Sequence, residues 1–210
     1  MHVNVLVRET NTVLPTDGGD WAGVDRGVYL LLKQSVHPVL TYGDFDSVSD
    51  EERDFIQSKL EITPVKPEKD ETDLELALLD IKDKRYQSID VYGATGGRID
   101  HLFGNVQLLV RDELKHLNIR LIDGANIVEV IPEGRHTVYK HPGMKYVSFI
   151  PVYEGTELTL EGMKYPLSSQ LLNIGSTLTI SNEFDDSKGE VSVNQPIIMI
   201  QSKDSGRMME

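Results

Sequence analysis

The sequence predicts two kinds of structure in one chain, an α/β part followed by an all-β part. Up to about residue 123, short apolar runs alternate with segments of helical periodicity, which is the pattern of a mostly parallel sheet flanked by helices. Beyond about residue 125 the helical period stops, and apolar runs recur at short intervals between Gly, Pro and Asn. That spacing is typical of a small all-β domain, sandwich-like or an open barrel. The turn "DGAN" separates the two patterns, so we expect one domain at residues 1–124 and a second at 125–210.

The first half contains five candidate strands, which are short, β-branched and bounded by polar residues. They cover 2–7, 38–42, 61–65, 88–94 and 118–123.

Helices are expected between these strands. Ser49 and Glu52 have the spacing of a capping box and predict a helix over 50–59. Its apolar side carries Phe55, Ile56 and Leu60. Two more helices follow from apolar residues at helical spacing, in 71–84 (Leu74, Leu78, Ile81) and in 101–117 (Leu102, Val106, Leu109, Val110).

The second half predicts strands only, since its apolar residues follow a strand period. The expected strands are 126–131, 135–140, 145–152, 156–162, 176–182, 189–194 and 196–202.

Composition excludes several classes of protein. The formal net charge of −13 argues against general binding to the nucleic-acid backbone, which needs a surplus of Lys and Arg. The sequence has no Cys, which removes disulfides, thiolate metal sites and cysteine nucleophiles and suits a reducing compartment. No run reaches the ~18 apolar residues of a membrane span, and "MHVNVLVRET" lacks the features of a signal peptide. We therefore expect a cytoplasmic protein that binds neither membranes nor nucleic acid.

Two aspartates, Asp44 and Asp46, follow the candidate strand 38–42 in the stretch "GDFDS". In extended chain, residues two apart point the same way and lie roughly 6.5 Å apart, close enough to serve one metal cluster. The alternative is an Asx turn that leads into the capped helix, because Asp and Ser favour turns. This motif alone does not decide between them.

A second acidic stretch, "DETD", opens the next helix with Asp70 and Asp73 on one face. Here the alternative is structural: Asp70 is a plain N-cap, and Asp73 is a first-turn charge that interacts favourably with the helix dipole.

A third stretch, "YGATGGRIDH", joins the candidate strand 88–94 to a helix and supplies Arg98 and Asp100. Glycines let the backbone approach a ligand, and amides at a helix N-terminus favour phosphate. The spacing is neither that of a dinucleotide fingerprint nor that of a Walker loop. As a bare pattern it is also compatible with a tight strand-to-helix turn.

The joint position of the three stretches favours a metal site. Each lies at or just beyond the carboxyl end of a candidate strand, where a parallel sheet binds ligands. Carboxylates brought together raise one another's pKa unless a cation compensates them. All-oxygen ligation suits Mg²⁺, which commonly binds one or two carboxylates together with substrate phosphates. The sequence therefore predicts a magnesium site that also holds a phosphate ligand.

In order along the chain, "VDRG" at 24–27, "GDFDS" at 43–47, "DETD" at 70–73 and "GGRIDH" at 96–101 resemble the thiamine pyrophosphokinase family. "GMKYPL" at 162–167 and "TISNEF" at 179–184 resemble the segments with which the family's β domain contacts thiamine. The resemblance implies transfer of a pyrophosphoryl group from ATP to thiamine, giving thiamine diphosphate and AMP. It also implies an N-terminal ATP-binding domain, a C-terminal thiamine-binding domain and a homodimer with sites between subunits.

The resemblance also implies roles for individual residues. The residues implied to bind metal or phosphate are Asp44, Asp46, Asp70 and Asp73, and Arg98 and Asp100 complete the phosphate site. The implied contacts of ATP are Asp25, Thr72 and Arg98. The implied contacts of thiamine are Tyr165, Ser181 and Asn182.

Two positions depart from the family pattern. Arg26 stands where many members have glycine, and Tyr165 stands where animal members have a tryptophan that stacks on thiamine. A flat cationic ligand should still stack on the tyrosine ring, although a half-buried strand aromatic is the alternative role. Two rival functions share the same carboxylates: a magnesium-dependent nucleotide hydrolase, and a thiamine or nucleotide sensor without turnover.

Overall fold

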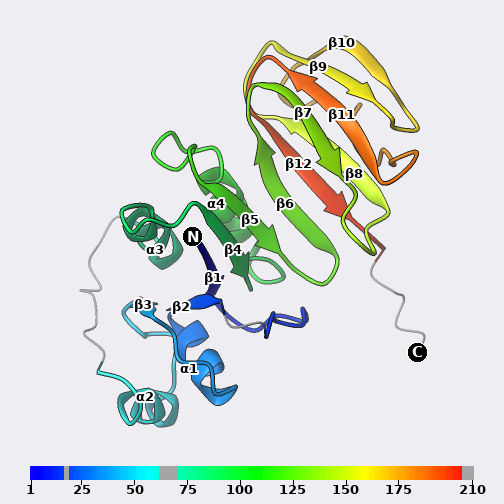
Figure 1. Ribbon diagram of the computed structural model, residues 1–210. Coiled ribbons are helices and arrows are strands. Elements are labelled where there is room, and N and C mark those ends of the chain that lie inside the picture. Colours follow the sequence, from blue (N-terminus) through cyan, green and yellow to red (C-terminus); the bar gives the residue numbers. More distant parts are fainter. Residues whose placement is uncertain (17–18, 62–70, 205–210) are drawn as a thin grey trace. The chain divides into compact units, whose positions relative to one another are not determined.

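A computed structural model describes residues 1–16, 19–61 and 71–204. The chain divides into two compact units, Met1–Gly124 and Ala125–Glu210, which Figure 1 shows as an α/β unit and a β unit. Within the described ranges, no helix combines the length and the apolar character needed to cross a membrane.

The first unit contains a parallel sheet with the strand order β3-β2-β1-β4-β5. Its strands are β1 (His2–Leu6), β2 (Asp20–Val24), β3 (Leu40–Tyr42), β4 (Ser88–Tyr92) and β5 (Asn118–Ile122). The chain moves outward from β1 to β2 and β3, and then returns to add β4 and β5 on the other side of β1. The boundary between β1 and β4 is therefore the topological switch point, outside whose carboxyl ends such sheets bind ligands.

The described residues of this unit form four helices: α1 (Arg26–Lys33), α2 (Asp50–Gln57), α3 (Asp73–Lys82) and α4 (Ile99–Leu108). The predicted capping box is confirmed, since Ser49 Oγ accepts from the Glu52 amide and the Glu52 carboxylate accepts from the Ser49 amide. In α3 the predicted apolar face is buried, with Leu74, Leu78 and Ile81 all at most 4% exposed. The buried face of α3 is therefore the face that the spacing of apolar residues in the sequence predicts.

β2 and α1 were not predicted from the sequence. "DWAGV" has only one β-branched residue and includes Asp and Gly, so it lacks the composition of a strand, yet it pairs in register with β1. The strand expected at 61–65 falls almost entirely outside the described residues.

The helix expected over 101–117 was too long, since α4 ends at Leu108. The amides of Leu109, Val110 and Arg111 donate to carbonyls three residues back, which tightens the chain into a turn. Leu109 and Leu114 are then buried from the turns rather than from a helix face.

The second unit consists of two antiparallel sheets, ordered β6-β12-β8 and β10-β9-β11-β7. The strands are β6 (Asn126–Ile131), β7 (Gly134–Tyr139), β8 (Tyr146–Pro151), β9 (Thr156–Glu161), β10 (Leu167–Leu172), β11 (Lys188–Val193) and β12 (Ile197–Ser202). Val147 and Phe149 of one sheet share a single buried core with Leu158 and Leu160 of the other. This confirms the expected sandwich-like β domain.

One predicted strand, 176–182, is wrong. That segment bends, and its Ser181 has a φ of +60°, which interrupts extended structure. It lies beside β8 through other bonds: the Thr179 hydroxyl donates to the Phe149 carbonyl, and the Ser181 amide donates to Ser148 Oγ at 2.9 Å. A strand that was not predicted, β10, precedes this segment at Leu167–Leu172; its polar sequence "LSSQLL" gave no strand signal.

Candidate functional site

Three aspartates from three different elements converge in the first unit. Asp25 follows β2, Asp44 lies two residues beyond β3, and Asp73 is the first residue of α3. Each offers a carboxylate oxygen, and these three oxygens all lie within 4.8 Å of one another. We call Asp25, Asp44 and Asp73 the acidic triad. Its strand-end members place it at the carboxyl edge of the parallel sheet, as expected from strands that share one direction.

Local backbone conformation brings the Asp25 carboxylate to this place. Asp25 has a φ of +48°, and its amide donates to the Tyr42 carbonyl at 2.9 Å, which ties the ends of β2 and β3 together. Gly43 follows, with a φ of +113°, and leaves the space that Asp25 Oδ1 occupies. Positive φ in a residue other than glycine costs free energy and is concentrated at functional sites.

The stretch "GDFDS" is an Asx turn and a part of the triad at once. Asp44 Oδ1 accepts a hydrogen bond from the Asp46 amide at 3.1 Å, while the Asp44 carboxylate belongs to the triad. Asp46 is exposed and lies outside the triad. Its assignment as a metal ligand therefore stays a prediction.

The electrostatics of the triad are compatible with a bound cation. Burial raises the pKa of Asp25 from 3.8 to about 7, with the charge of Asp73 and then that of Asp44 adding to the effect. Carboxylate oxygens clustered in this way are the kind of ligand that Mg²⁺ prefers. The residues present thus fit a divalent cation, which would lower the pKa of Asp25 again.

The other residues predicted for this site take different positions. The N-cap of α3 is Thr72 and not Asp70, because the Thr72 hydroxyl accepts from the Glu75 amide at 3.3 Å. Asp70 lies outside the described residues. Arg98 and Asp100 are exposed at the start of α4 and form an ion pair with each other, Nη2 to Oδ2 at 2.5 Å. The guanidinium of Arg98 lowers the pKa of Asp100.

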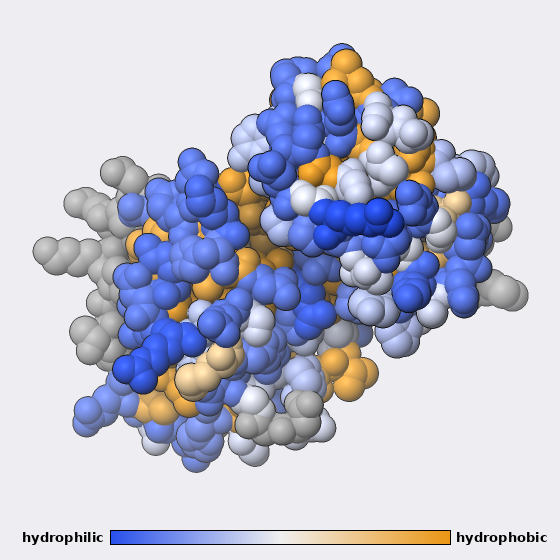
Figure 2. All heavy atoms as spheres, turned by 45° about the horizontal axis from the view of Figure 1, so that its top comes forward, coloured by the Kyte–Doolittle hydropathy of each residue, from blue (hydrophilic) through white to orange (hydrophobic). Residues whose placement is uncertain are grey.

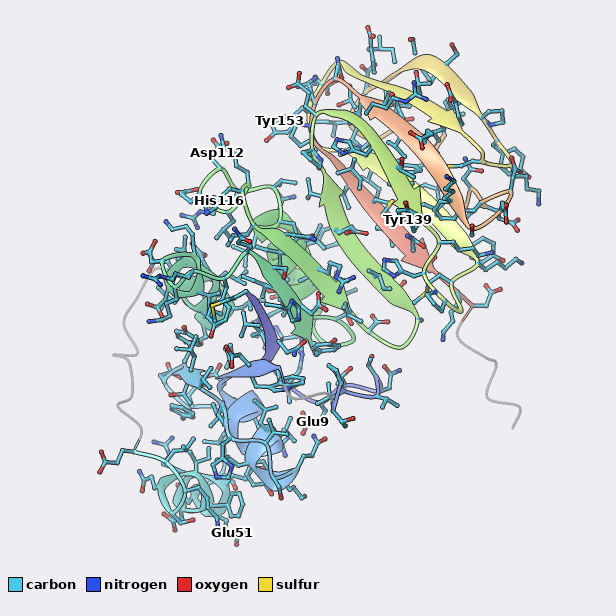
Figure 3. The ribbon with its side chains drawn as sticks, in the orientation of Figure 1. Glu9, Glu51, Asp112, His116, Tyr139 and Tyr153 are labelled. Atoms are coloured by element: carbon cyan, nitrogen blue, oxygen red, sulfur yellow. The ribbon has the colours of Figure 1, made fainter. Side chains whose placement is uncertain are left out.

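Arg26 does not add a free cation to this edge. Its guanidinium donates to the Glu52 carboxylate from Nε and Nη2 and pairs with Glu9, which is labelled in Figure 3. The arginine that replaces glycine in the family pattern is therefore neutralised by two carboxylates.

In the second unit, the residues predicted to contact thiamine form a local cluster. Tyr165 is 58% exposed, and the buried Asn182 side chain is hydrogen-bonded to it in both directions. Asn182 Oδ1 accepts from the Tyr165 amide at 3.0 Å, and Asn182 Nδ2 donates to the Tyr165 carbonyl at 2.9 Å. The Asn182 side chain thus holds the backbone of Tyr165, and the tyrosine ring stays available to a ligand.

The surroundings of the Tyr165 ring already include a cation. Lys164 Nζ lies 5.7 Å from the ring centroid and pairs with Glu183 at 2.9 Å. The exposed Ser181 precedes Asn182 and has the left-handed backbone described above. This cluster presents a flat ring beside acidic and basic groups, which suits a flat cationic ligand.

Two residues of the first unit were missed by sequence reasoning. Asp25 was expected as an ATP contact and not as part of a carboxylate cluster, because the strand before it was not recognised. Arg8 was not considered, although it follows β1 at the same edge as the triad; its Nε donates to the Gly93 carbonyl at 2.9 Å. A charged residue directly after a candidate strand is the signal that could have indicated Arg8, which follows the candidate strand 2–7; no such signal was present for Asp25, because β2 lacks the composition of a strand.

Comparison with known proteins agrees with this arrangement. Residues 20–121 match the family model "Thiamin pyrophosphokinase, catalytic domain", and residues 135–198 match "Thiamin pyrophosphokinase, vitamin B1 binding domain". A curated thiamine pyrophosphokinase of Bacillus subtilis is 44% identical over 187 residues, which cover 88% of this chain and 87% of the relative.

Solved structures agree as well. A crystal structure of Bacillus subtilis thiamine pyrophosphokinase has a TM-score of 0.88 and 38% identity, covering 97% of this chain and all of the other (100%). A thiamin pyrophosphokinase family protein of Enterococcus faecalis has a TM-score of 0.89 and 33% identity, covering 98% of this chain and 100% of the other. On its two domain matches and its overall identity to these relatives, the chain belongs to the thiamine pyrophosphokinase family.

Proposed function

We propose that this member of the thiamine pyrophosphokinase family carries out its reaction at the acidic triad. The reaction passes the pyrophosphoryl group of ATP to the hydroxyl of thiamine and yields thiamine diphosphate and AMP. The observation that carries the proposal is the convergence of Asp25, Asp44 and Asp73 within 4.8 Å at the carboxyl edge of the sheet. Folding alone does not require three carboxylates there, whereas Mg²⁺ binds carboxylate oxygens together with the phosphates of its nucleotide.

In this proposal each unit binds a different substrate. Residues 1–124 bind ATP and Mg²⁺, and residues 125–210 bind thiamine through the exposed ring of Tyr165. Ser181 stays in the proposed thiamine site. Thr72 and Arg98 stay in the proposed ATP site, and Asp70 in the proposed metal site. Asn182 acts through Tyr165.

The chemistry follows from positioning and charge. The thiamine hydroxyl oxygen forms a bond to the β-phosphorus of ATP, the bond from that phosphorus to the bridging oxygen breaks, and AMP leaves with that oxygen. When bound, Mg²⁺ offsets the negative charge of the phosphate oxygens. Asp25, Asp44 and Asp73 would hold the cation, and a carboxylate such as Asp73 or Asp100 would accept the hydroxyl proton.

We further propose a homodimer with sites between subunits. Apolar side chains reach the surface of the second unit, as Figure 2 shows in orange on the β unit. The exposed aliphatic residues of this unit include Leu171, Ile174, Leu178 and Ile180, each at least 45% exposed, and Tyr165 is 58% exposed. A second copy of the chain would cover this apolar surface and bring the thiamine residue Tyr165 to the interface. The absence of Cys from the sequence supports a cytoplasmic location.

The deciding experiment is an incubation of the purified protein with ATP, Mg²⁺ and thiamine, followed by quantitation of AMP and thiamine diphosphate. Equal amounts of the two products, both dependent on thiamine, are expected. ATP cleavage in the absence of thiamine would support a hydrolase instead, and binding without product would support a sensor. Family membership favours the transferase over both rivals.

A further inference from the structure

Arg8 lies at the switch point of the parallel sheet, two residues after the end of β1. The Val7 amide donates to the Tyr92 carbonyl at 3.0 Å, so pairing between β1 and β4 continues up to the point where the glycine-rich stretch 93–97 begins. Arg8 therefore lies directly beside that stretch, at the place in an open α/β sheet where ligands bind.

The Arg8 guanidinium is fixed against the glycines. Its Nε donates to the Gly93 carbonyl at 2.9 Å. At Gly97, an added Cβ would fall 1.9 Å from Nη1 and 2.9 Å from Nη2 of the same arginine. The guanidinium thus occupies the position of a Cβ at residue 97, with Nη1 nearest, and the glycine leaves the space for it.

The charge of Arg8 is not neutralised as that of its neighbours is. Arg26 pairs with Glu9 and Glu52, and Arg98 pairs with Asp100. Among residues 1–16, 19–61 and 71–204, no carboxylate pairs with Arg8, which is only partly exposed. A partly buried guanidinium without an anion is costly, so the pattern indicates a site for an anionic ligand.

We infer that Arg8 binds the polyphosphate of the nucleotide, and that Gly97 is glycine in order to admit its guanidinium. The inference rests on the proposed function, which brings a triphosphate to this edge. Four N–H groups on Nη1 and Nη2 remain for phosphate oxygens, in the planar fork that recognises phosphate bidentately. Arg8 would supply the direct contact, while Arg98 is already paired with Asp100.

The test measures the dissociation constant of the magnesium complex of α,β-methylene-ATP by calorimetry. Arg8→Gln should raise it about 10-fold to 100-fold, as expected for lost hydrogen bonds to a charged group. Binding of thiamine should stay unchanged. Arg26→Gln is the matched control, an arginine at the same edge that already has carboxylate partners, and should stay within about twofold. Unchanged affinity in Arg8→Gln would overturn the inference.

A second variant gives an independent test should Arg8→Gln fail to fold. Gly97→Ala keeps Arg8 but fills its space, and should weaken binding of the analogue by a similar factor. If the two residues act as one unit, the double variant should bind no more weakly than the weaker single variant. Additive losses would overturn the inference. Product formation by the unaltered protein is measured in parallel, so a failure of the proposed reaction is distinguished from a failure of the role of Arg8.

Discussion

The Asp25 carboxylate lies against Gly43: a Cβ at position 43 would fall 1.9 Å from Asp25 Oδ1 and 3.1 Å from the Asp25 amide nitrogen. Gly43 also has a φ of +113°, a conformation that side chains rarely adopt. The chain thus uses one glycine to bring the end of β3 close to the residue that follows β2. Two members of the acidic triad, Asp25 and Asp44, depend on this approach.

Gly43→Ala should therefore lower the transfer rate on the order of 100-fold, the cost of a misplacement of about 1 Å in a catalytic group. The measurement is the rate of thiamine diphosphate formation at saturating ATP and thiamine. Gly155→Ala is the control, because Gly155 also has positive φ, +72°, but has no atom near its Cβ position. It should lose stability and keep its rate. Full activity in Gly43→Ala would show that the contact with Asp25 does not matter.

The raised pKa of Asp25 predicts a dependence of stability on pH in the metal-free protein. An acid whose pKa is raised on folding contributes stability below its unfolded value of 3.8, and that contribution is lost as the pH rises through about 7. The groups that face Asp25 are Asp73 and Asp44. The Tm of the unaltered protein should thus fall, relative to that of Asp25→Asn, between pH 4 and pH 8.

Excess Mg²⁺ sharpens this test. A cation bound by the triad favours ionised Asp25, so it should raise the Tm of the unaltered protein more at pH 8 than at pH 5. Asp25→Asn should show a smaller rise. If the Tm of the unaltered protein and the Tm of Asp25→Asn change with pH in parallel, both with and without Mg²⁺, the triad is excluded as a cation site.

The sequence predicted the fold class because strand and helix periods are separate along the chain, and burial follows them. β2 was not predicted because the composition of "DWAGV" does not favour a strand; its extended structure depends on pairing with β1. That miss also hid the position of Asp25. In the second unit, "STLTISN" reads as a strand, but the backbone of Ser181 and the bonds to β8 override that local preference.

The site was predictable only where a motif carries it. "GDFDS" left a turn and a metal site as alternatives, and the structure shows that Asp44 closes the turn and also belongs to the acidic triad, since one carboxylate oxygen can accept in the turn while the carboxylate joins the triad. Arg8 has no motif around it. Its relation to Gly97 joins residues far apart in the chain, which no local spacing reveals.

Removing single carboxylates of the triad should separate its members from other acidic residues. Asp44→Asn and Asp73→Asn should each lower the transfer rate about 100-fold to 1,000-fold, because several kcal/mol of charge stabilisation depend on the cation that they hold. The concentration of Mg²⁺ needed for half the maximal rate should rise as well. Asp112→Asn, an exposed aspartate paired only with Lys115 in the described part of the chain, is the control. Wild-type rates in either triad variant would refute the metal site.

Asp46→Asn asks a narrower question, because Asp46 is exposed and outside the triad. As a contact of metal-bound water or phosphate it should lower the transfer rate about 10-fold to 100-fold, like an outer-shell partner of a metal site. The measurement is a titration of the rate with Mg²⁺. An unchanged rate and an unchanged Mg²⁺ requirement would remove Asp46 from the proposed site and leave the triad in place.

The Tyr165 ring and the Asn182 amide should both govern thiamine binding, by different means. Tyr165→Ala removes the stacking surface and should raise the KM for thiamine about 10-fold, whereas Tyr165→Trp should preserve or lower it. Asn182→Ala leaves the partly buried Tyr165 amide without its acceptor, so it should raise the same KM and also lower the free energy of unfolding by about 1 kcal/mol. The KM for ATP should not change. Tyr139→Ala, an exposed tyrosine on β7 (Figure 3), is the control. A Tyr165→Ala protein with an unaltered thiamine KM would assign the ring a structural role and move the thiamine site elsewhere.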